Sequence, residues 1–406
     1  MDLFDKVRNY TRVKEAKEMG IYPYFQPLQN SEGTTARING KDVVMIGSNN
    51  YLGLTTHPKV RQAAMDAIAT YGTSCTGSRF LNGTLELHLE LERRLARFHG
   101  AEAALTFTTG YQANVGTITA LVGKGDYVIV DKEDHASIVD GCMMCLGEMR
   151  RFQHSDLSSL ERVLNNVPDT AGKLVVIDGV YSMGGDIAPL KEIVALCKKY
   201  GARIMVDDAH GVGVNGPGGR GTVAHFNMMD DIDVMMGTFS KSFASVGGYI
   251  VGKADVLHYI QHNARPLIFS ASLPPANAAT VLACLDIIES EPGIVESLWD
   301  NAEYMRKNLR EMGFDIGYSN TPIIPIIIRD EIRTVLAWRA LIDEGVYTNP
   351  VVPPGVPPAL SLLRTSYTAT HTREHLDRAL AALKLVGERL DLFLMNQQAL
   401  TSENLG

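Results

Sequence analysis

The sequence has few cysteines and no hydrophobic run long enough to cross a membrane. Five cysteines are spread over 406 residues, which is typical of a reducing compartment and argues against a disulfide-built secreted fold. No stretch approaches the roughly 18 uninterrupted apolar residues of a spanning helix, and the first residues show no apolar leader with a cleavage site. We therefore expect a cytoplasmic protein, and peripheral contact with a membrane is compatible with this expectation.

Basic residues are also in the minority. The 38 Lys and Arg residues stand against 46 Asp and Glu, which gives a formal net charge of −8. A nucleic-acid binder usually carries a basic face, so no nucleic-acid partner is expected. An anionic ligand remains compatible with this charge, because backbone N–H groups can hold a phosphate locally.

Motifs for nucleotides and metals are missing as well. No G-x-G-x-x-G follows the first strand and no G-x-x-x-x-G-K-[ST] occurs, which argues against a nucleotide-binding α/β protein. Cys142 and Cys145 form a lone C-x-x-C, whereas a zinc site would need a second pair. No metal site is therefore expected.

What the chain does have is an alternation of short apolar runs with amphipathic stretches. The runs that we interpret as buried strands are 127–130, 174–177, 204–206, 234–236 and 249–251. Solidly apolar strands that alternate with helices predict an α/β fold, with a mainly parallel sheet covered on both faces.

The chain is too long for one domain of average size, and the pattern of expected strands and helices changes along its length. Residues 51–290 are expected to form the large α/β domain. Residues 291–406 are expected to form a smaller C-terminal α+β domain, with helices at about 294–313 and 373–393. Residues 1–50 look like an N-terminal arm, with a helix near 2–19 and a hairpin at Asn39–Gly40.

Lys241 is the first candidate for chemistry. It lies just past an apolar strand, in Gly237-Thr-Phe-Ser-Lys-Ser-Phe-Ala-Ser-Val-Gly-Gly248. A single lysine is usually a solvated surface charge, but small and hydroxyl residues flank this one. A lysine in a partly desolvated pocket becomes a nucleophilic amine that forms imines. Thr238 and Ser240 could donate hydrogen bonds to a nearby phosphate.

A second apolar strand ends in Asp207, Asp208 and His210. A pyridoxal-phosphate (PLP) enzyme needs a carboxylate against the pyridine nitrogen of its cofactor, because a protonated nitrogen makes the ring an electron sink. Asp207 is the better candidate for this role, and His210 could reach the ring oxygen O3′. Asp208 is expected to cap a turn.

Two more strand ends carry suitable residues. Gly110 and Tyr111 form a turn between a strand and a helix, whose first N–H groups could cradle a phosphate. His135 follows another strand and opens a helix, where it could stack on a cofactor ring. Open α/β sheets bind ligands at the carboxyl ends of their strands. The four segments together are therefore stronger evidence for a ligand site than any one of them.

These residues resemble a known family. The runs T-G-Y, D-H-A-S-I-x-D-G, D-G-V-x-S-M, V-D-D-A-H-G and G-T-F-S-K-S resemble the α-oxoamine synthases, PLP enzymes of fold type I, and the resemblance extends from about residue 20 to 390. It is closest to the bacterial serine palmitoyltransferases, on the segments 77–84, 265–275 and 346–354 with 362–365. The resemblance implies decarboxylative condensation of an amino acid, L-serine, with a long-chain acyl-CoA, palmitoyl-CoA.

The resemblance also implies roles for individual residues. Lys241, His135, Asp207 and His210 would be catalytic, and Asn50 and Arg364 would bind substrate. The implied cofactor-binding residues are Gly110, Tyr111, His135, Ser182, Asp207, His210, Thr238, Ser240, Lys241, Ser270 and Ser272.

A shared dimer site is implied too. Asn49 and Asn50 would enter the neighbouring subunit's site, and Ser270 and Ser272 would reach the neighbour's phosphate, so a homodimer is expected. The chain departs from some of these relatives at Val352, where they carry an arginine. An apolar residue cannot supply a second carboxylate contact there.

Several alternatives remain open at the level of the sequence. One is condensation of glycine with acetyl-CoA, as in glycine C-acetyltransferase. Another is condensation of alanine with a pimeloyl thioester, as in 8-amino-7-oxononanoate synthase. A transaminase and an inactive binding homologue are the others, but the intact set of Lys241, Asp207 and His210 argues against an inactive protein.

The role of Lys241 can be tested by absorbance. We expect the purified protein to show the visible imine band of bound PLP. Lys241→Ala should lose this band, because Lys241 is the residue expected to supply the amine of the imine. Borohydride reduction should trap the cofactor on Lys241 in the unmodified protein. A colourless protein without a trapped lysine would contradict the prediction.

Overall fold

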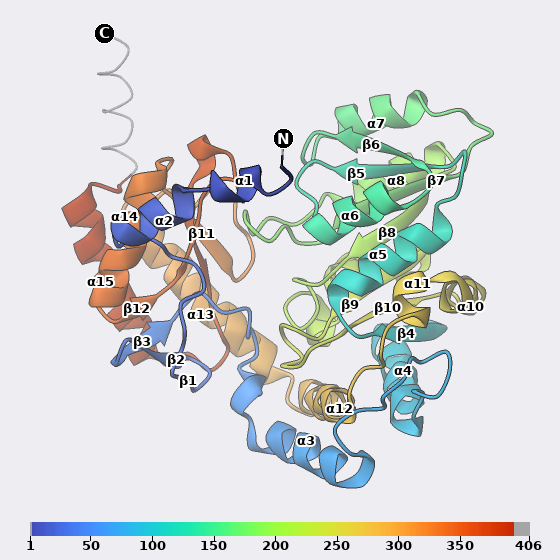
Figure 1. The fold of residues 1–406 in the computed structure, drawn as a ribbon, viewed down its shortest axis with the longest axis horizontal. Coiled ribbons are helices and arrows are strands. Elements are labelled where there is room, and N and C mark those ends of the chain that lie inside the picture. The colour runs from blue at the N-terminus through green and yellow to red at the C-terminus, as the bar shows by residue number, and fades with distance from the viewer. Residues whose placement is uncertain (1, 394–406) are drawn as a thin grey trace. The chain divides into compact units, whose positions relative to one another are not determined.

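The computed structural model describes residues 2–393, which divide into two compact units (Figure 1). The large unit contains Asn49–Trp299 and Asn320–Pro322. The small unit contains the residues up to Ser48, Asp300–Ser319, and the described residues from Ile323 onward.

A seven-stranded sheet forms the centre of the large unit, in the order β4-β10-β9-β8-β7-β5-β6. Its strands are β4 (Ala103–Phe107), β5 (Tyr127–Asp131), β6 (Glu148–Phe152), β7 (Lys173–Asp178), β8 (Arg203–Asp207), β9 (Val234–Thr238) and β10 (Gly248–Gly252). β10 pairs antiparallel with β4 and with β9, and the other strand pairs of this sheet are parallel. The predicted strands are all present, and the prediction of a mainly parallel sheet is confirmed.

Helices precede, connect and follow these strands. They are α3 (Pro58–Tyr71), α4 (Glu86–His99), α5 (Gly110–Leu121), α6 (Ala136–Met144), α7 (Leu157–Asn165), α8 (Leu190–Lys199), α9 (Thr222–His225), α10 (Ala254–Asn263), α11 (Arg265–Ile268) and α12 (Pro275–Ser290). Every residue of β7 is buried, on both faces of the strand. The sheet is therefore covered on both sides, as parallel sheets are.

The small unit contains two sheets. The first has the order β1-β2-β3-β12 and the second β11-β14-β13. Its strands are β1 (Asn30–Ser31), β2 (Thr35–Ile38), β3 (Lys41–Met45), β11 (Ile323–Ile327), β12 (Val346–Tyr347), β13 (Asn349–Val351) and β14 (Leu362–Ser366). Asn39 and Gly40 join β2 to β3 with φ of 50° and 76°, the positive values that a tight hairpin turn requires. The predicted hairpin is confirmed.

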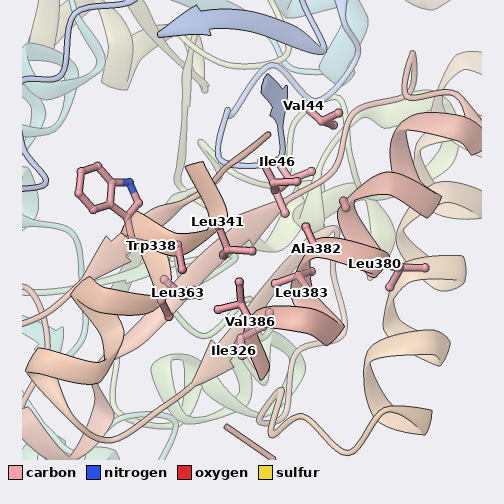
Figure 2. Close-up of a cluster of buried hydrophobic side chains, with 14 of the residues drawn as sticks. Val44, Ile46, Ile326, Trp338, Leu341, Leu363, Leu380, Ala382, Leu383 and Val386 are labelled. Atoms are coloured by element: carbon pink, nitrogen blue, oxygen red, sulfur yellow. The ribbon is translucent and has the colours of Figure 1, made fainter. Parts of the chain in front are cut away.

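The core of the small unit lies between its strands and two helices, α14 (Glu331–Asp343) and α15 (Arg373–Leu390). Figure 2 shows Trp338 and Leu341 of α14 and Leu383 and Val386 of α15 in this cluster, together with Ile326 of β11. The named residues of each helix are three positions apart and share one face, so α14 and α15 each contribute an amphipathic face to the cluster. Met305 and Leu309 of a third helix also belong to it.

The N-terminal segment differs from the expected arm. It contains two short helices, α1 (Asp5–Arg8) and α2 (Arg12–Glu18), in place of one helix over 2–19. Asn9, Tyr10 and Thr11 separate them, and all three are weak helix formers. β3 pairs in parallel with β12, with Val346 opposite Val44, and this pairing places residues up to 48 in the small unit.

The C-terminal boundary also differs from residue 290. The helix α13 (Gly293–Glu311) begins in the large unit and ends in the small one. Its first part is anchored within the large unit, where Trp299 Nε1 donates a hydrogen bond to the Val214 carbonyl at 2.8 Å. Among the described residues, no helix is long and apolar enough to cross a membrane.

The packing of α15 can be tested with two leucines of the same helix. Leu383 is 2% exposed, so Leu383→Ala should lower the free energy of unfolding by about 2–5 kcal/mol through lost burial and a residual cavity. Leu385 is 47% exposed, and Leu385→Ala should change that free energy by only about 0.5 kcal/mol. Urea denaturation of both variants measures the difference, and equal losses would contradict this account of the core.

Candidate active site

A cavity of about 290 Å³ opens at the carboxyl ends of the parallel strands in the large unit. Its lining residues are Thr109, Gly110, Tyr111, Asn114, His135, Ser137, Asp178, Val180, Asp207, Ala209, His210, Met236, Thr238, Ser240, Lys241, Val246 and Gly247. They come from segments that are distant in sequence. The sheet therefore brings together most of the residues that the sequence singles out.

Asp207 ends β8 and is buried in the cavity wall. Its Oδ2 accepts a hydrogen bond from Asn114 Nδ2 at 2.6 Å, and its Oδ1 accepts one from the Ala209 backbone N–H at 2.9 Å. Asn114 Nδ2 also donates to Ser137 Oγ at 2.8 Å, so α5 and α6 together hold it in place. These contacts fix the direction of the Asp207 carboxylate.

Two histidines contribute to the same cavity. His135 Nδ1 lies 2.7 Å from Ser137 Oγ, a contact that fixes the ring at the start of α6. His135 is exposed at the cavity, yet its walls still desolvate the ring. This desolvation lowers the pKa of His135, with Asp207 opposing the shift and Lys241 adding to it. The ring is therefore neutral at neutral pH, which suits stacking against a flat ligand.

His210 is oriented by a residue that the sequence reading did not single out. Tyr51 is fully buried, and its Oη lies 2.7 Å from His210 Nδ1. This contact holds the imidazole by one ring nitrogen. Tyr51 thus contributes to the ring orientation of His210 at the cavity.

The start of α5 and the end of β9 form a group of hydrogen-bond donors. Thr109 caps α5 by accepting a hydrogen bond from the Gln112 N–H at 3.1 Å. Thr238 Oγ1 lies 2.9 Å from Ser240 Oγ. A Cβ at Gly110 would come within 2.8 Å of Thr238 Oγ1, so only glycine allows this close approach of α5 to β9. Helix N-terminal amides with two hydroxyls form a favourable setting for a phosphate.

With this geometry in view, comparison with known proteins is informative. A family model for aminotransferase class I and II matches residues 41–383. The chain belongs to the aminotransferase class I and II family. This membership confirms the expected fold type I.

Individual relatives are similar over nearly the whole chain. A serine palmitoyltransferase of Sphingobacterium spiritivorum is 46% identical over 96% of this chain and 98% of its own length. An 8-amino-7-oxononanoate synthase of Thermoanaerobacter pseudethanolicus is 44% identical over 94% of this chain and 97% of its own.

A solved structure is similar too. The structure of a serine palmitoyltransferase variant from S. paucimobilis, with bound PLP-myriocin aldimine, superposes with a TM-score of 0.93. The two chains are 38% identical, over 97% of this chain and 100% of that one. These relatives confirm the resemblance to the α-oxoamine synthases.

Some residues that the sequence assigned to this family site do not line the cavity. Ser182 lies in the segment after β7. Ser270 Oγ accepts a hydrogen bond from Gln112 Nε2 at 3.0 Å, and Ser272 Oγ donates to the Gly77 carbonyl at 2.9 Å. Asn50 Nδ2 donates to Thr55 Oγ1 at 2.9 Å. Their predicted roles toward the cofactor and substrate stay predictions.

The last predicted substrate residue lies in the small unit. Arg364 is buried on β14, where it pairs with Pro325 of β11 and Asn349 of β13. Val352 follows β13 and is 8% exposed, as part of the hydrophobic core of this unit. An apolar residue at 352 therefore has a packing role, whatever an arginine does in relatives that carry one.

Several residues at the cavity or behind it were not singled out from the sequence, among them Asn114, Ser137, Asp178 and Tyr51. Asn114 lies one helical turn beyond Gly110, so helix periodicity could have indicated it. Asp178 ends the strand predicted at 174–177, and the rule that ligands bind at strand ends applies to it equally. Tyr51 gave no local signal, because its contact with His210 spans 159 positions.

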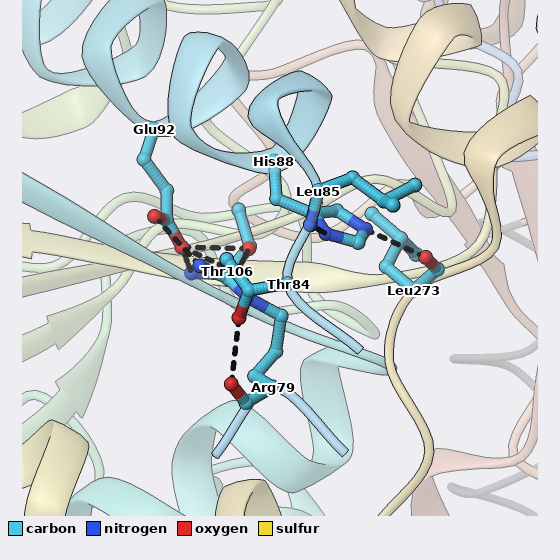
Figure 3. A network of polar contacts seen from close by, with 7 residues as sticks. All are labelled: Arg79, Thr84, Leu85, His88, Glu92, Thr106 and Leu273. Atoms are coloured by element: carbon cyan, nitrogen blue, oxygen red, sulfur yellow. Dashed lines mark hydrogen bonds and ion pairs between the residues drawn. The ribbon is translucent and has the colours of Figure 1, made fainter. Parts of the chain in front are cut away.

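A buried ion pair supports the segment 77–84, which carries part of the family resemblance. Figure 3 shows Arg79 facing Glu92 of α4. Their contacts are bidentate, at 2.8 and 3.0 Å, and Glu92 Oε1 also accepts the Thr106 N–H of β4 at 2.9 Å. Both charged side chains are largely buried, so truncation of one would leave the other without its partner.

The same segment is tied to the chain near residue 273. Just beyond this segment, His88 Nε2 of α4 contacts the Leu273 carbonyl at 2.8 Å, as Figure 3 also shows. The Ser272 N–H donates to the Gly77 carbonyl at 2.9 Å. Two segments that carry the resemblance, 77–84 and 265–275, therefore form one hydrogen-bonded structure.

A second charged network supports the segment after β7. His154 Nδ1 lies 3.0 Å from Asp131 at the end of β5, and its Nε2 lies 3.0 Å from Asp186. Burial alone would lower the pKa of His154, but hydrogen bonds to Asp131 and Asp186 outweigh it and raise the pKa to about 10. The imidazolium thus links β5 to the segment that carries Ser182.

This network predicts a pH-dependent contribution to stability. Because the folded-state pKa of His154 lies above its ordinary value of 6.5, the stabilisation is complete below pH 6.5 and is lost as the pH rises toward about 10. His154→Gln should therefore lower the free energy of unfolding more at pH 6 than at pH 10, as measured by urea denaturation.

The matched control is His225→Gln, which changes an exposed histidine of the same unit. It should have a small effect at both pH values. A loss for His154→Gln that does not depend on pH would show that the histidine acts only through packing.

Proposed function

We propose that this chain condenses L-serine with palmitoyl-CoA, with loss of CO2 and CoA, to give 3-ketodihydrosphingosine, the first product of sphingolipid synthesis. The observation that supports this proposal is the similarity of almost the entire chain to serine palmitoyltransferases, together with the intact set of residues at the cavity. The protein is an acyltransferase of the α-oxoamine synthase type, with PLP as its cofactor.

The residues at the cavity fit PLP chemically. Asp207 is held by two donors so that a carboxylate faces the ligand space, as a pyridine nitrogen requires. Lys241 supplies the amine, and the start of α5 with Thr238 and Ser240 supplies phosphate donors. His135 supplies a neutral ring. Each part of the cofactor therefore has a counterpart among side chains that the sheet brings together.

The chain's own residues divide the work of the reaction. Lys241 Nζ would hold the cofactor until the amine of the amino acid displaces it. The freed Lys241 amine would then remove and return the proton at the amino-acid Cα. Asp207 would keep the pyridine nitrogen protonated, and His210 would orient the ring oxygen. When bound, PLP supplies the electron sink for the charge that develops at Cα.

Arg364 is proposed to bind the substrate carboxylate through its guanidinium fork. Asn50, Ser270 and Ser272 are proposed to act across a homodimer with shared active sites. A cytoplasmic location and peripheral contact with a membrane also remain predictions from the sequence.

A second activity is supported by a specific observation. The 8-amino-7-oxononanoate synthase relative is almost as similar as the serine palmitoyltransferases, at 44% identity. The residues proposed above serve any amino acid and any acyl thioester, because they act on the cofactor and on Cα. Condensation of alanine with a pimeloyl thioester is therefore the alternative.

Release of CoA distinguishes the two activities. The PLP-loaded enzyme should release thiol fastest with L-serine and palmitoyl-CoA, and more slowly with glycine or alanine and with shorter acyl-CoA donors. The measurement is a thiol-detection assay over a matrix of amino acids and acyl chains. A clear preference for alanine with pimeloyl-CoA would replace the proposed function by the alternative.

A further inference from the structure

Asp178 is a buried acid at the cavity that the mechanism above does not use. It ends β7, directly opposite Asp207 in the parallel register of β7 and β8, and Asp207 in turn pairs with Met236 of β9. Paired residues of parallel strands lie on the same face, about 4.8 Å apart. All three line the cavity, so two carboxyl groups stand side by side in its wall.

The two carboxyl groups have very different surroundings. Asp207 accepts hydrogen bonds on both oxygens, from Asn114 and from the Ala209 N–H. Asp178 is 4% exposed, and its Oδ1 has no hydrogen-bond partner among the described residues. Two adjacent buried carboxyls do not both ionise readily, and hydrogen bonds to one of them favour its charged form. The negative charge therefore belongs on Asp207 and the proton on Asp178.

Other groups around Asp178 support this assignment. Burial raises its pKa well above the ordinary value, and the charges of Asp207 and Asp134 add to the shift, while Lys241 and the His135 backbone N–H oppose it. Burial also raises the pKa of Asp134. Asp134, however, accepts the backbone N–H groups of Asp131 and Asp178 at 2.8 and 2.9 Å, contacts that favour its carboxylate over a second neutral acid.

We propose that Asp178 is a neutral carboxylic acid at physiological pH and donates a hydrogen bond to an anionic oxygen of the bound ligand. This deepens the proposed function, on which the identity of the ligand rests. Two oxygens share the required chemistry, the phenolate oxygen of the cofactor and the carboxylate of the amino acid. A neutral donor at residue 178 stabilises negative charge on the ligand. An ionised Asp178 would instead repel that charge and the carboxylate of Asp207.

The protonation state can be read by infrared spectroscopy of the holoenzyme. At a pH of about 8.5, far above the ordinary carboxyl pKa, the unmodified enzyme should show the carbonyl band of a protonated carboxylic acid. Asp178→Asn should remove that band, and Asp134→Asn should leave it. No band in the unmodified enzyme, or a band that Asp134→Asn removes and Asp178→Asn leaves, would overturn the proposal.

The donor role needs a second pair of variants. Asp178→Asn keeps a neutral side chain with an N–H donor, whereas Asp178→Ala has no donor, so the first is the matched control for the second. If the acceptor is the cofactor oxygen, the pH titration of visible absorbance without amino acid should shift in Asp178→Ala. If it is the substrate carboxylate, the Kd for L-serine should rise by roughly 10-fold or more in Asp178→Ala instead.

Asp178→Asn should resemble the unmodified enzyme in both measurements. An Asn variant as impaired as the Ala variant, or an Ala variant unchanged in both, would overturn the donor role. The infrared and PLP titrations involve no acyl-CoA, so they remain interpretable if the enzyme prefers another acyl donor or amino acid. In that case the proposed function fails and the protonation of Asp178 is still decided.

Discussion

Parallel pairing of β5, β7, β8 and β9 brings the carboxyl ends of four strands to one edge of the sheet, and these strands end or are followed by charged side chains. The carboxyl ends of parallel strands necessarily lie at the same edge of the sheet. The site therefore has a concentration of acids in a buried place. The other groups of the site stabilise these buried charges through hydrogen bonds and ion pairs.

Each acid is stabilised in a different way. Asp207 is held by a side-chain amide and a backbone N–H, and Asp134 by two backbone N–H groups. Asp131 loses solvation on burial, yet contacts with His154 and two backbone N–H groups lower its pKa overall. Among these four acids Asp178 differs, because its Oδ1 has no hydrogen-bond partner within the described chain. Protonation removes the charge of such a buried group. It also makes the carboxyl group a hydrogen-bond donor.

This arrangement explains why two activities are close in sequence similarity. The cavity residues are proposed to act on the cofactor and on Cα, and both proposed condensations require these two functions. Selection of the amino acid and of the acyl chain must therefore come from other residues. Arg364 and the segment after β13 lie in the small unit, where Val352 contributes to the hydrophobic core. A difference at residue 352 thus changes packing as well as charge.

The sequence by itself determined five strands of the large sheet, the mainly parallel fold and most of the cavity residues, because apolar runs and the residues that end them are local patterns. Lys241, Asp207, His210, His135 and Gly110 were all visible in this way. Only the tertiary structure decided the lateral contacts: Asp178 beside Asp207, Tyr51 on His210 and Asn114 on Asp207. It also decided that residues up to 48 belong with the C-terminal strands. Strand register and long-range hydrogen bonds join residues far apart in the chain, and no local pattern encodes them.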